Sequence, residues 1–433
     1  MTSIVFTSLF LGLVAGSQTV GVLVDGPAAA IEYELDGESL GRVAGPPWNL
    51  RVSLGEDLSP KELVARALDR EGREVARARQ WLNLPREDAE TEVVLERNQA
   101  GQAVAARLSW QSILGSKPLA RSATFDGRPV AIDNSGRIAL PAYDPAVTHL
   151  LSARLQFPEG VSSRADVVLG GGSAEEAKSE LTAIAVRLGK GHKLPPLGRL
   201  QDWFVSGGRP LRVVAVEDKG GEVVIVRDRG NGEASRTLEG FRYAVRGAAR
   251  GLRYEMRLGG GIHTRLLWPV SKRYQDPRIA SDLFDSSGDL STQNLHWILT
   301  RVHGSLGSLP RQRFADATAV AGLVAFGSSS RRAVVLVLGT PADSSAHSPE
   351  AVRHYLASVR VPLHVWSLVD PAARPEFARW GEVVDVSSVD KLRKAFRALR
   401  ADLRSQRVVW FEGKHLPQKI ELTEKAVGVK PVR

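Results

Sequence analysis

The sequence predicts a multidomain protein, with two antiparallel β-sandwiches followed by an α/β domain that has a doubly wound, mostly parallel sheet. Three observations predict this architecture. The chain has 433 residues, which is too long for one ordinary domain. Its first half consists of short alternating stretches separated by turn dipeptides. From Glu222 onward, apolar strands alternate with stretches of helical periodicity, the pattern of a parallel sheet covered on both faces.

The amino-terminal stretch predicts export. Residues 1–24 carry no charged side chain, and the apolar core at 4–16 is too short to span a bilayer. Small residues at Ala15, Gly16 and Ser17 follow it, as at a signal-peptidase site. We therefore expect a signal peptide over 1–17 and a periplasmic or extracellular protein. The alternative is a buried first strand. No later stretch is apolar enough for a membrane span.

Residues 18–97 are predicted to form the first β-sandwich. The segment 31–35 alternates between polar and apolar residues and runs into Asp36-Gly37, a turn dipeptide. A second strand at 63–68 ends in an acidic turn, and a third begins at Val75. Strands at this spacing are typical of an antiparallel sandwich of about 80 residues.

Residues 98–188 repeat this plan and are predicted to form a second sandwich. The segment 123–127 (ATFDG) is similar to 34–37, and 149–153 is similar to 63–65. A repeat of roughly 85 to 90 residues is one whole sandwich and is too long for a solenoid unit. A linker or docking segment is expected at 189–210, where two prolines occur together.

The α/β domain is predicted over 211–413, with a polar tail at 414–433. The apolar run at 222–228 ends in the carboxylate of Asp228 and is followed by small residues, so we expect a buried parallel strand that brings this acid to an edge of the sheet. Ser348-Pro349 is a strong helix start, and Ser387 with Asp390 forms a capping box. The other predicted elements are strands at 211–216, 333–338, 362–369, 382–386 and 408–411, a hairpin around 259–261, and helices at 235–249, 290–306, 313–326 and 391–404.

The order of these elements resembles a von Willebrand factor type A domain. The resemblance covers 211–413 and is carried by the motifs VVLVLG at 334–339, VPLHVWSL at 361–368 and VVWF at 408–411. The repeated segment before it resembles bacterial immunoglobulin-like modules. Together they are similar to exported bacterial proteins in which an A-type domain follows such modules. The resemblance implies a doubly wound sheet with an open crevice at the strand ends.

The family's metal-ion-dependent adhesion site reads Asp-x-Ser-x-Ser, with a further aspartate from a later loop. Mg²⁺ needs several oxygen ligands in near-octahedral array. Glycines stand here at both serine positions and at the later aspartate position, so Asp228 is the single weak candidate for a metal ligand. We expect a degenerate site with no metal and no cofactor. The residues expected to line the crevice are Asp228, Arg229, Gly230, Asn231, Gly232 and Gly339.

A second oxygen-rich cluster lies at 285–291 (DSSGDLS). Its spacing is similar to half of a calcium loop. The favoured interpretation is a capping loop in which Asp289 or Ser291 accepts hydrogen bonds from backbone N–H groups.

Composition narrows the classes of function. The net charge is +10 and the pI is near 9.9, but the basic residues are scattered and do not alternate with aromatic ones, so no nucleic-acid partner is expected. The same charge attracts anionic cell-surface polymers. The chain has no cysteine, which excludes disulfides and thiolate chemistry.

The predicted function is binding. We expect a non-enzymatic exported protein that contacts a protein or a cell-surface polymer through a crevice lined by Asp228, Arg229 and Asn231. No Gly-x-Ser-x-Gly or His-Glu-x-x-His motif is present. Two alternatives stay open, a hydrolase with a site assembled between domains and a metal-dependent adhesin.

Overall fold

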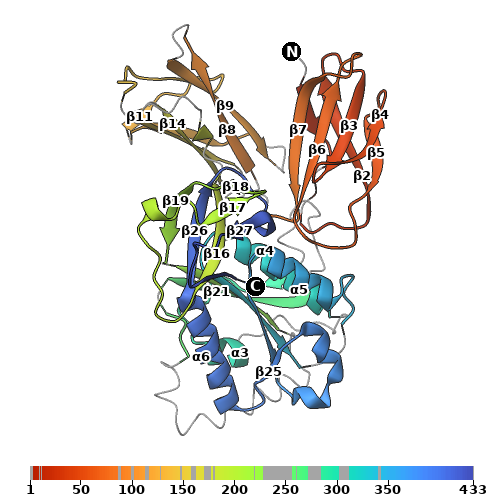
Figure 1. Ribbon diagram of the computed structural model, residues 1–433, viewed down its shortest axis with the longest axis vertical. Helices are drawn as coiled ribbons and strands as arrows, with labels where there is room; N and C mark the ends of the chain where they lie inside the picture. The colour runs from red at the N-terminus through yellow and green to blue at the C-terminus, as the bar shows by residue number, and fades with distance from the viewer. Residues whose placement is uncertain are drawn as a thin grey trace. The chain divides into compact units, whose positions relative to one another are not determined.

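The computed structural model forms two compact units (Figure 1). One comprises Met1–Pro85, Ala183–Phe411 and His415–Arg433, and the other comprises Arg86–Thr182 and Glu412–Lys414. The structure describes residues 3–8, 10, 12–85, 89–98, 102–112, 117–126, 128–146, 149–157, 162–169, 177–178, 181–218, 220–227, 256–259, 261–271, 284–301, 312–339 and 343–432.

The first sandwich has two antiparallel sheets, of order β1-β2-β5 and β4-β3-β6-β7. Val20, Ile31 and Leu63 are fully buried between them. Asp36 and Gly37 have φ of 53° and 89°, which confirms the predicted turn. The strands are β1 (Ser3–Phe6), β2 (Ser17–Asp25), β3 (Ala30–Leu35), β4 (Glu38–Val43), β5 (Asn49–Ser53), β6 (Lys61–Leu68) and β7 (Glu74–Leu82).

The amino-terminal stretch takes part in this sandwich. Strand β1 pairs antiparallel with β2, with Ser3 opposite Asp25 and Phe6 opposite Val22. Ile4 is buried in the sandwich core. Residues 3–6 therefore form a first strand, and the signal peptide stays a prediction. Export also stays a prediction.

The second sandwich repeats this topology. Its sheets have the order β8-β9-β12 and β11-β10-β13-β14-β15. The pair Phe125–Leu151 corresponds to Leu35–Leu63 of the first sandwich, and Asp126 has a φ of 50°, like Asp36. The strands are β8 (Ala89–Arg97), β9 (Ala103–Ser112), β10 (Ala120–Phe125), β11 (Arg128–Val130), β12 (Arg137–Ala139), β13 (His149–Gln156), β14 (Ser162–Leu169) and β15 (Ala177–Lys178).

A third β-module differs from the predicted plan. Residues predicted as a linker and as a polar tail form strands in it, and β16, predicted to close the second sandwich, lies between β26 and β28. The reason is burial, because Phe204, Ile420 and Val432 are at most 2% exposed. The strands formed by the predicted linker and tail have only two or three residues each, too few to show a period. The strands of the module are β16 (Leu181–Leu188), β17 (Phe204–Ser206), β18 (Arg209–Pro210), β19 (Val213–Glu217), β26 (Gln406–Glu412), β27 (Ile420–Leu422) and β28 (Val429–Pro431).

The α/β domain is inserted into this third module. The chain leaves the module after β19 and returns in β26, and these two strands pair antiparallel, with Val216 opposite Val409. Strand β26, predicted as the last strand of the α/β domain, therefore belongs to the module that carries the domain.

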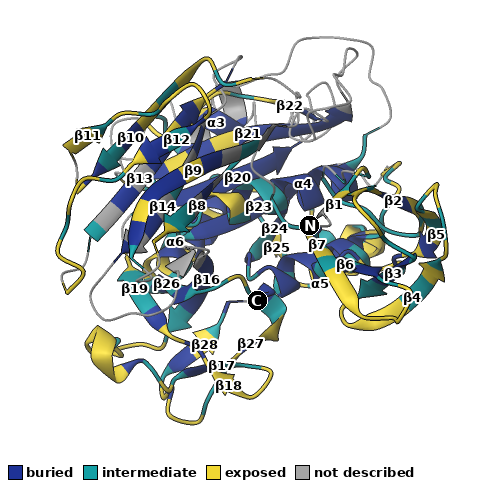
Figure 2. Ribbon diagram, turned by 90° about the horizontal axis from the view of Figure 1, so that it is seen from above, coloured by how far each residue is buried: buried dark blue, intermediate teal, exposed yellow. Residues whose placement is uncertain are grey.

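The α/β domain has one sheet of order β22-β21-β20-β23-β24-β25, in which all neighbours are parallel except β21 and β22. This confirms the predicted doubly wound class. Every residue of β20 and β23 is buried, as Figure 2 shows for the centre of the sheet. The strands are β20 (Gly221–Arg227), β21 (Ile262–Ser271), β22 (Phe284–Ser286), β23 (Arg332–Leu338), β24 (Leu363–Ser367) and β25 (Val383–Asp385).

Helices cover both faces of this sheet. Val223 and Ile225 pack toward α3 and α6, whereas Val224 and Val226 pack toward α4 and α5, as the twofold period of a strand requires. The helices are α3 (Leu295–Arg301), α4 (Phe314–Gly327), α5 (Pro349–Ser358) and α6 (Val389–Ser405). Short 3₁₀ turns are η2 (Leu197–Arg199), η4 (Pro371–Ala373), η5 (Pro375–Trp380) and η6 (Pro417–Lys419).

Four local predictions have different outcomes. The Ser348 side chain accepts a hydrogen bond from Ala351 N with Pro349 at the first turn, which confirms that cap. The cap of α6 is Ser388, one residue beyond the predicted Ser387. The predicted hairpin at 259–261 is wrong, because residues 256–259 form no strand and β21 pairs with β20 and β22. The predicted helix at 235–249 lies outside the described residues.

Candidate functional site

The strand order of the α/β sheet reverses at β20. The chain runs from β20 outward to β21 and β22, then crosses to β23 on the other side of β20. In open α/β sheets, ligands bind beyond the carboxyl ends of the strands where the order reverses in this way. The candidate site is therefore the edge formed by the carboxyl ends of β20, β23 and β24.

The predicted site residues fall largely beyond the described chain. Asp228, Arg229, Gly230, Asn231 and Gly232 follow β20 directly but lie outside the described residues. Gly339 is described and buried at the end of β23. Next to it, Leu368 N donates a 3.0 Å hydrogen bond to Leu338 O, so the ends of β23 and β24 are held together.

Arg227 closes the described part of β20 at this edge. Its side chain is fully buried, and Nη1 donates a hydrogen bond to Leu299 O of α3. A buried guanidinium needs such acceptors, because an unsatisfied charged donor is costly in a dry interior. This contact ties the end of β20 to α3.

Asp343 brings a carboxylate to the edge from the segment after β23. Its Oδ1 accepts from Phe314 N at 2.9 Å and its Oδ2 from Ala315 N at 3.1 Å. Ser345 Oγ donates a third hydrogen bond, of 2.5 Å, to Oδ1. Asp343 therefore caps the first turn of α4 from a distant loop.

Asp316 makes the reciprocal contact from α4 to the same loop. It is 5% exposed, and its two oxygens accept from Ala346 N and His347 N at 3.0 Å each. Arg313 adds an ion pair at 2.7 Å. Two carboxylates thus connect the start of α4 with the loop at 343–347. Each of their oxygens already accepts at least one hydrogen bond from a backbone N–H group.

Sequence reasoning missed Asp343 and Asp316. It examined the single position directly after the β23 strand, which is Gly339, and found no carboxylate there. The available signal was the run Asp343-Ser344-Ser345, an oxygen-rich stretch just before a capped helix.

The other carboxylates at this edge are also engaged. Asp370 Oδ1 accepts from Ala372 N at 3.0 Å. Asp385 accepts from Ser387 N at 2.8 Å and forms a 2.5 Å ion pair with Lys391. Burial raises the pKa of Asp385, but the hydrogen bonds from Lys391 and Ser387 outweigh it, so the net shift of the pKa is downward.

These residues do not fit a divalent cation. Mg²⁺ requires several free oxygen ligands converging on one point. In the described part of the chain, no group of three or more His, Asp or Glu side chains is arranged to hold a metal ion. Within the described residues, the carboxylates at this edge bind backbone N–H groups, Arg313 or Lys391 instead.

The cluster at 285–291 binds backbone groups, as favoured from the sequence. Asp289 Oδ1 accepts from Ser291 N at 3.0 Å and from Thr264 N at 3.3 Å, and Oδ2 lies 3.0 Å from His263 Nδ1. Burial raises the pKa of Asp289, but these hydrogen bonds outweigh it and lower the pKa to about 2. The cap of α3 is a different residue, Asn294, whose Oδ1 accepts from Trp297 N.

Comparisons with known proteins give only distant likenesses. No protein-family model matches the chain, and no curated protein matches it. Among solved structures, the fibronectin(III)-like modules of Clostridium thermocellum CbhA are 11% identical with a TM-score of 0.16, covering 38% of this chain and 92% of that one. The central fibronectin-III array of RIM-binding protein is 12% identical with a TM-score of 0.24, covering 40% and 72%.

Proximal thread matrix protein 1 of the mussel byssus is 13% identical, with a TM-score of 0.28. The match covers 50% of this chain and 50% of that one, so this chain spans half the length of the mussel protein. At these values the likenesses carry no argument about function. Within the described residues, no helix has the length and apolarity needed to cross a bilayer.

Proposed function

We propose that this chain is a non-enzymatic binding protein whose inserted α/β domain is a divergent von Willebrand factor type A domain. The observation that carries the proposal is the strand order β22-β21-β20-β23-β24-β25, a doubly wound sheet with its reversal between β20 and β23. That reversal makes the carboxyl edge of the sheet a ready binding crevice.

Recognition at this edge is proposed to be direct, without a bridging metal. Gly230, Gly232 and Gly339 offer no side-chain ligand at the three positions where the adhesion site needs oxygen. Asp343 and Asp316, the nearest described carboxylates, are occupied by backbone N–H groups. A partner would therefore be bound by hydrogen bonds from the loop that begins at Asp228.

The partner class is a protein or a cell-surface polymer. Arg229 and Asn231, like Asp228, are polar, and they follow directly after the buried end of β20. We propose export to the periplasm or the exterior, with the β-sandwiches as spacers or additional binding surfaces.

The test is capture of partners from the cell envelope with the immobilised full chain. The variant carries Asp228→Ala and Asn231→Ala, and the matched control carries Asp25→Ala and Asn134→Ala, two exposed polar residues on the sandwiches. We expect the crevice variant to lower recovery about tenfold, because each lost charge-assisted hydrogen bond costs about 1.5 kcal/mol or more. The control should recover the same amount as the wild type.

Equal recovery by both variants would show that Asp228 and Asn231 do not contribute to binding. Loss of recovery in EDTA, restored by Mg²⁺, would favour the metal-dependent adhesin instead.

A further inference from the structure

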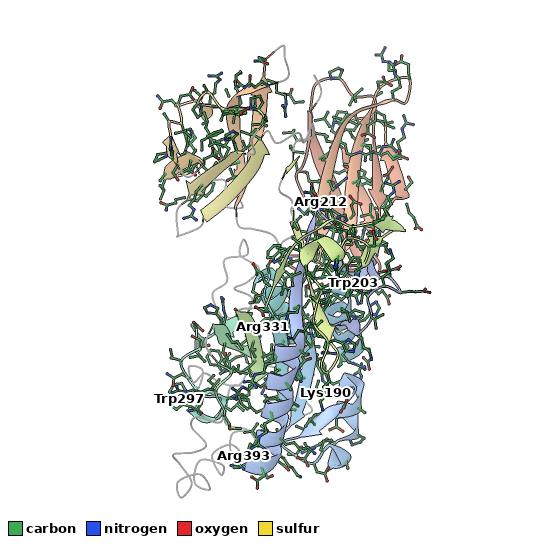
Figure 3. All side chains as sticks on the ribbon, turned by 60° about the vertical axis from the view of Figure 1, so that its left-hand side comes forward. Lys190, Trp203, Arg212, Trp297, Arg331 and Arg393 are labelled. Atoms are coloured by element: carbon green, nitrogen blue, oxygen red, sulfur yellow. The ribbon has the colours of Figure 1, made fainter. Side chains whose placement is uncertain are left out.

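Helix α6 presents a basic face to solvent. Arg393, Arg397, Arg400 and Arg404 are spaced i, i+4, i+7 and i+11, so they lie on one side of the helix. Lys394 is exposed beside them. At 1.5 Å per residue the stripe extends over about 17 Å. Figure 3 shows the helix with Arg393 labelled at one end.

The core-facing side of α6 lies about 100° around the helix from the arginines, so Arg397 and Arg404 are exposed whereas Arg393 and Arg400 are partly buried. Leu392, Phe396, Leu399 and Leu403 are at most 1% exposed and pack against the α/β sheet. The helix therefore has no free apolar face with which to enter a lipid bilayer. Its exposed face offers charge alone.

Four basic side chains of α6, not including Arg393, have no acidic partner within the described residues. Among the described residues, no ion pair involves Lys394, Arg397, Arg400 or Arg404. Both acids of α6 already have basic partners, one of which is Arg393 of the stripe itself. Asp390 pairs with Arg393 at 2.7 Å. Asp402 points inward, where Arg187 lies 2.6 Å away.

Like charges at these spacings repel one another, and an external anion relieves the repulsion. Guanidinium groups bind carboxylate and sulfate oxygens through paired N–H donors. A row of them matches a polymer that carries such groups at regular intervals.

The surroundings of the stripe favour a polysaccharide over a nucleic acid. The exposed positions beside the arginines are Ala398 and Ala401, which leave a smooth surface against which a chain can lie. No exposed residue of α6 is aromatic, so bases would find no stacking platform.

We propose that the exposed face of α6 binds a linear anionic polysaccharide. This surface is separate from the crevice at the carboxyl edge of the sheet, and the proposal does not depend on the crevice.

The test measures binding of the full chain to heparin, a sulfated polysaccharide, and to polygalacturonate, a carboxylated one, with duplex DNA as a third ligand. The variant carries Lys394→Gln, Arg397→Gln and Arg404→Gln. Glutamine has nearly the helix propensity of lysine and arginine, so charge is removed without weakening the helix. The matched control carries Arg42→Gln, Arg70→Gln and Arg209→Gln, three exposed arginines outside the α/β domain, and has the same net charge.

We expect the α6 variant to bind the preferred polysaccharide about tenfold more weakly, and the slope of log K against log salt to fall by about 2 as three contacts are lost. The control should stay close to wild type, and circular dichroism should be the same for all three proteins. The stronger of the two polysaccharides identifies the anionic group.

Three results would overturn the proposal. Equal losses in the variant and the control would show that net charge alone drives binding. Tighter binding of DNA than of both polysaccharides would assign the surface to nucleic acid. If the wild-type chain binds neither polysaccharide near physiological salt, α6 does not bind such polymers.

Discussion

Single carboxylates at the crevice work as backbone caps. Asp343 accepts the first N–H groups of α4, and Asp316 accepts two N–H groups of the loop that carries Asp343. Sequence patterns identify caps that adjoin their helix, such as Ser348 before α5. They do not identify Asp343, because it lies 29 residues along the chain from Phe314, the residue it caps.

Removing the Asp343 carboxylate should weaken α4. Asp343→Ala leaves two backbone N–H groups without their acceptors, and we expect a loss of about 1–2 kcal/mol in the free energy of unfolding. Asp343→Asn keeps one acceptor oxygen and should lose less. Urea unfolding of the full chain measures both. Equal stability of Asp343→Ala and wild type would show that solvent replaces this cap at no cost.

His149 makes the second sandwich sensitive to pH. Its Nδ1 lies 2.6 Å from Asp126 Oδ2, and this hydrogen bond raises the pKa of His149. Because the folded pKa is raised, the stabilisation is fully present below the ordinary histidine value near 6.5 and is lost as the pH rises through the raised pKa.

Asp126→Asn tests this pH dependence. Asparagine tolerates the positive φ of position 126, so the backbone is kept while the charge is removed. We expect the thermal midpoint of wild type to exceed that of the variant at pH 5.5 and to approach it at pH 8.5. A constant difference across that range would exclude titration of His149 as its source.

At the scale of elements, α4 and α5 approach closely where α4 has a glycine. A Cβ built on Gly322 would lie 2.1 Å from Leu356 Cδ2. At this point the two helices are so close that a methyl group at position 322 would collide with the Leu356 side chain. This contact positions the two helices over the same face of the sheet.

Gly322→Ala should therefore destabilise the chain although alanine favours helix. The propensity gain is about 1 kcal/mol, and overpacking against Leu356 costs about 1–3 kcal/mol. We expect a net loss in urea unfolding, which Leu356→Ala in the same chain should partly relieve. A Gly322→Ala variant that is more stable than wild type would show that Leu356 moves aside freely.

Strands and helices could be predicted from the sequence where they are fully buried and where the stretch of apolar residues is long. Strand β23 is apolar after its first residue and lies where the sequence places a strand, and α4 begins within one residue of its expected start. Strands β17, β18, β27 and β28 have two or three residues each, too few to show a period. Strands β17, β27 and β28 also pair with strands more than 200 residues away, which no local pattern encodes.

At the scale of the whole chain, the α/β domain joins its host module through a partly buried polar cluster. Asp402 of α6 lies 2.6 Å from Arg187 of β16 and 3.3 Å from His364 of β24. Gln406, the first residue of β26, adds a 3.3 Å hydrogen bond to Asp402. Burial raises the pKa of Asp402, but the contacts with His364 and Arg187 outweigh it and lower the pKa overall.

Asp402→Asn should loosen this junction. Since Asp402 is buried and Arg187 is partly exposed, we expect a loss of about 2–3 kcal/mol at pH 7. The folded pKa is lowered, so the difference from wild type should shrink as the pH falls below about 4. Asp390→Asn, an exposed acid of the same helix, is the control and should change stability by about 0.5 kcal/mol or less. A similar small effect of both variants would contradict a role for the cluster in stability.

The sequence predicts the fold classes of the domains better than it predicts how the chain connects them or which contacts form at the candidate site. The change from alternating short strands to strand–helix alternation at Glu222 predicted both fold classes. The insertion was not predictable, because β16 and β28 flank the α/β domain in sequence and meet only in the folded chain. At the crevice, the position of Gly339 was predictable, but the engagement of Asp343 and Asp316 was not.

Calorimetric titration of MgCl₂ and MnCl₂ into the full chain tests the central claim most directly. We propose that partners bind at the carboxyl edge of the sheet without a metal, because glycines stand at three ligand positions and the described carboxylates nearby accept hydrogen bonds from backbone N–H groups. This proposal predicts no saturable heat and the same thermal midpoint with and without either ion. Saturable binding of one ion that Asp228→Ala abolishes would contradict it.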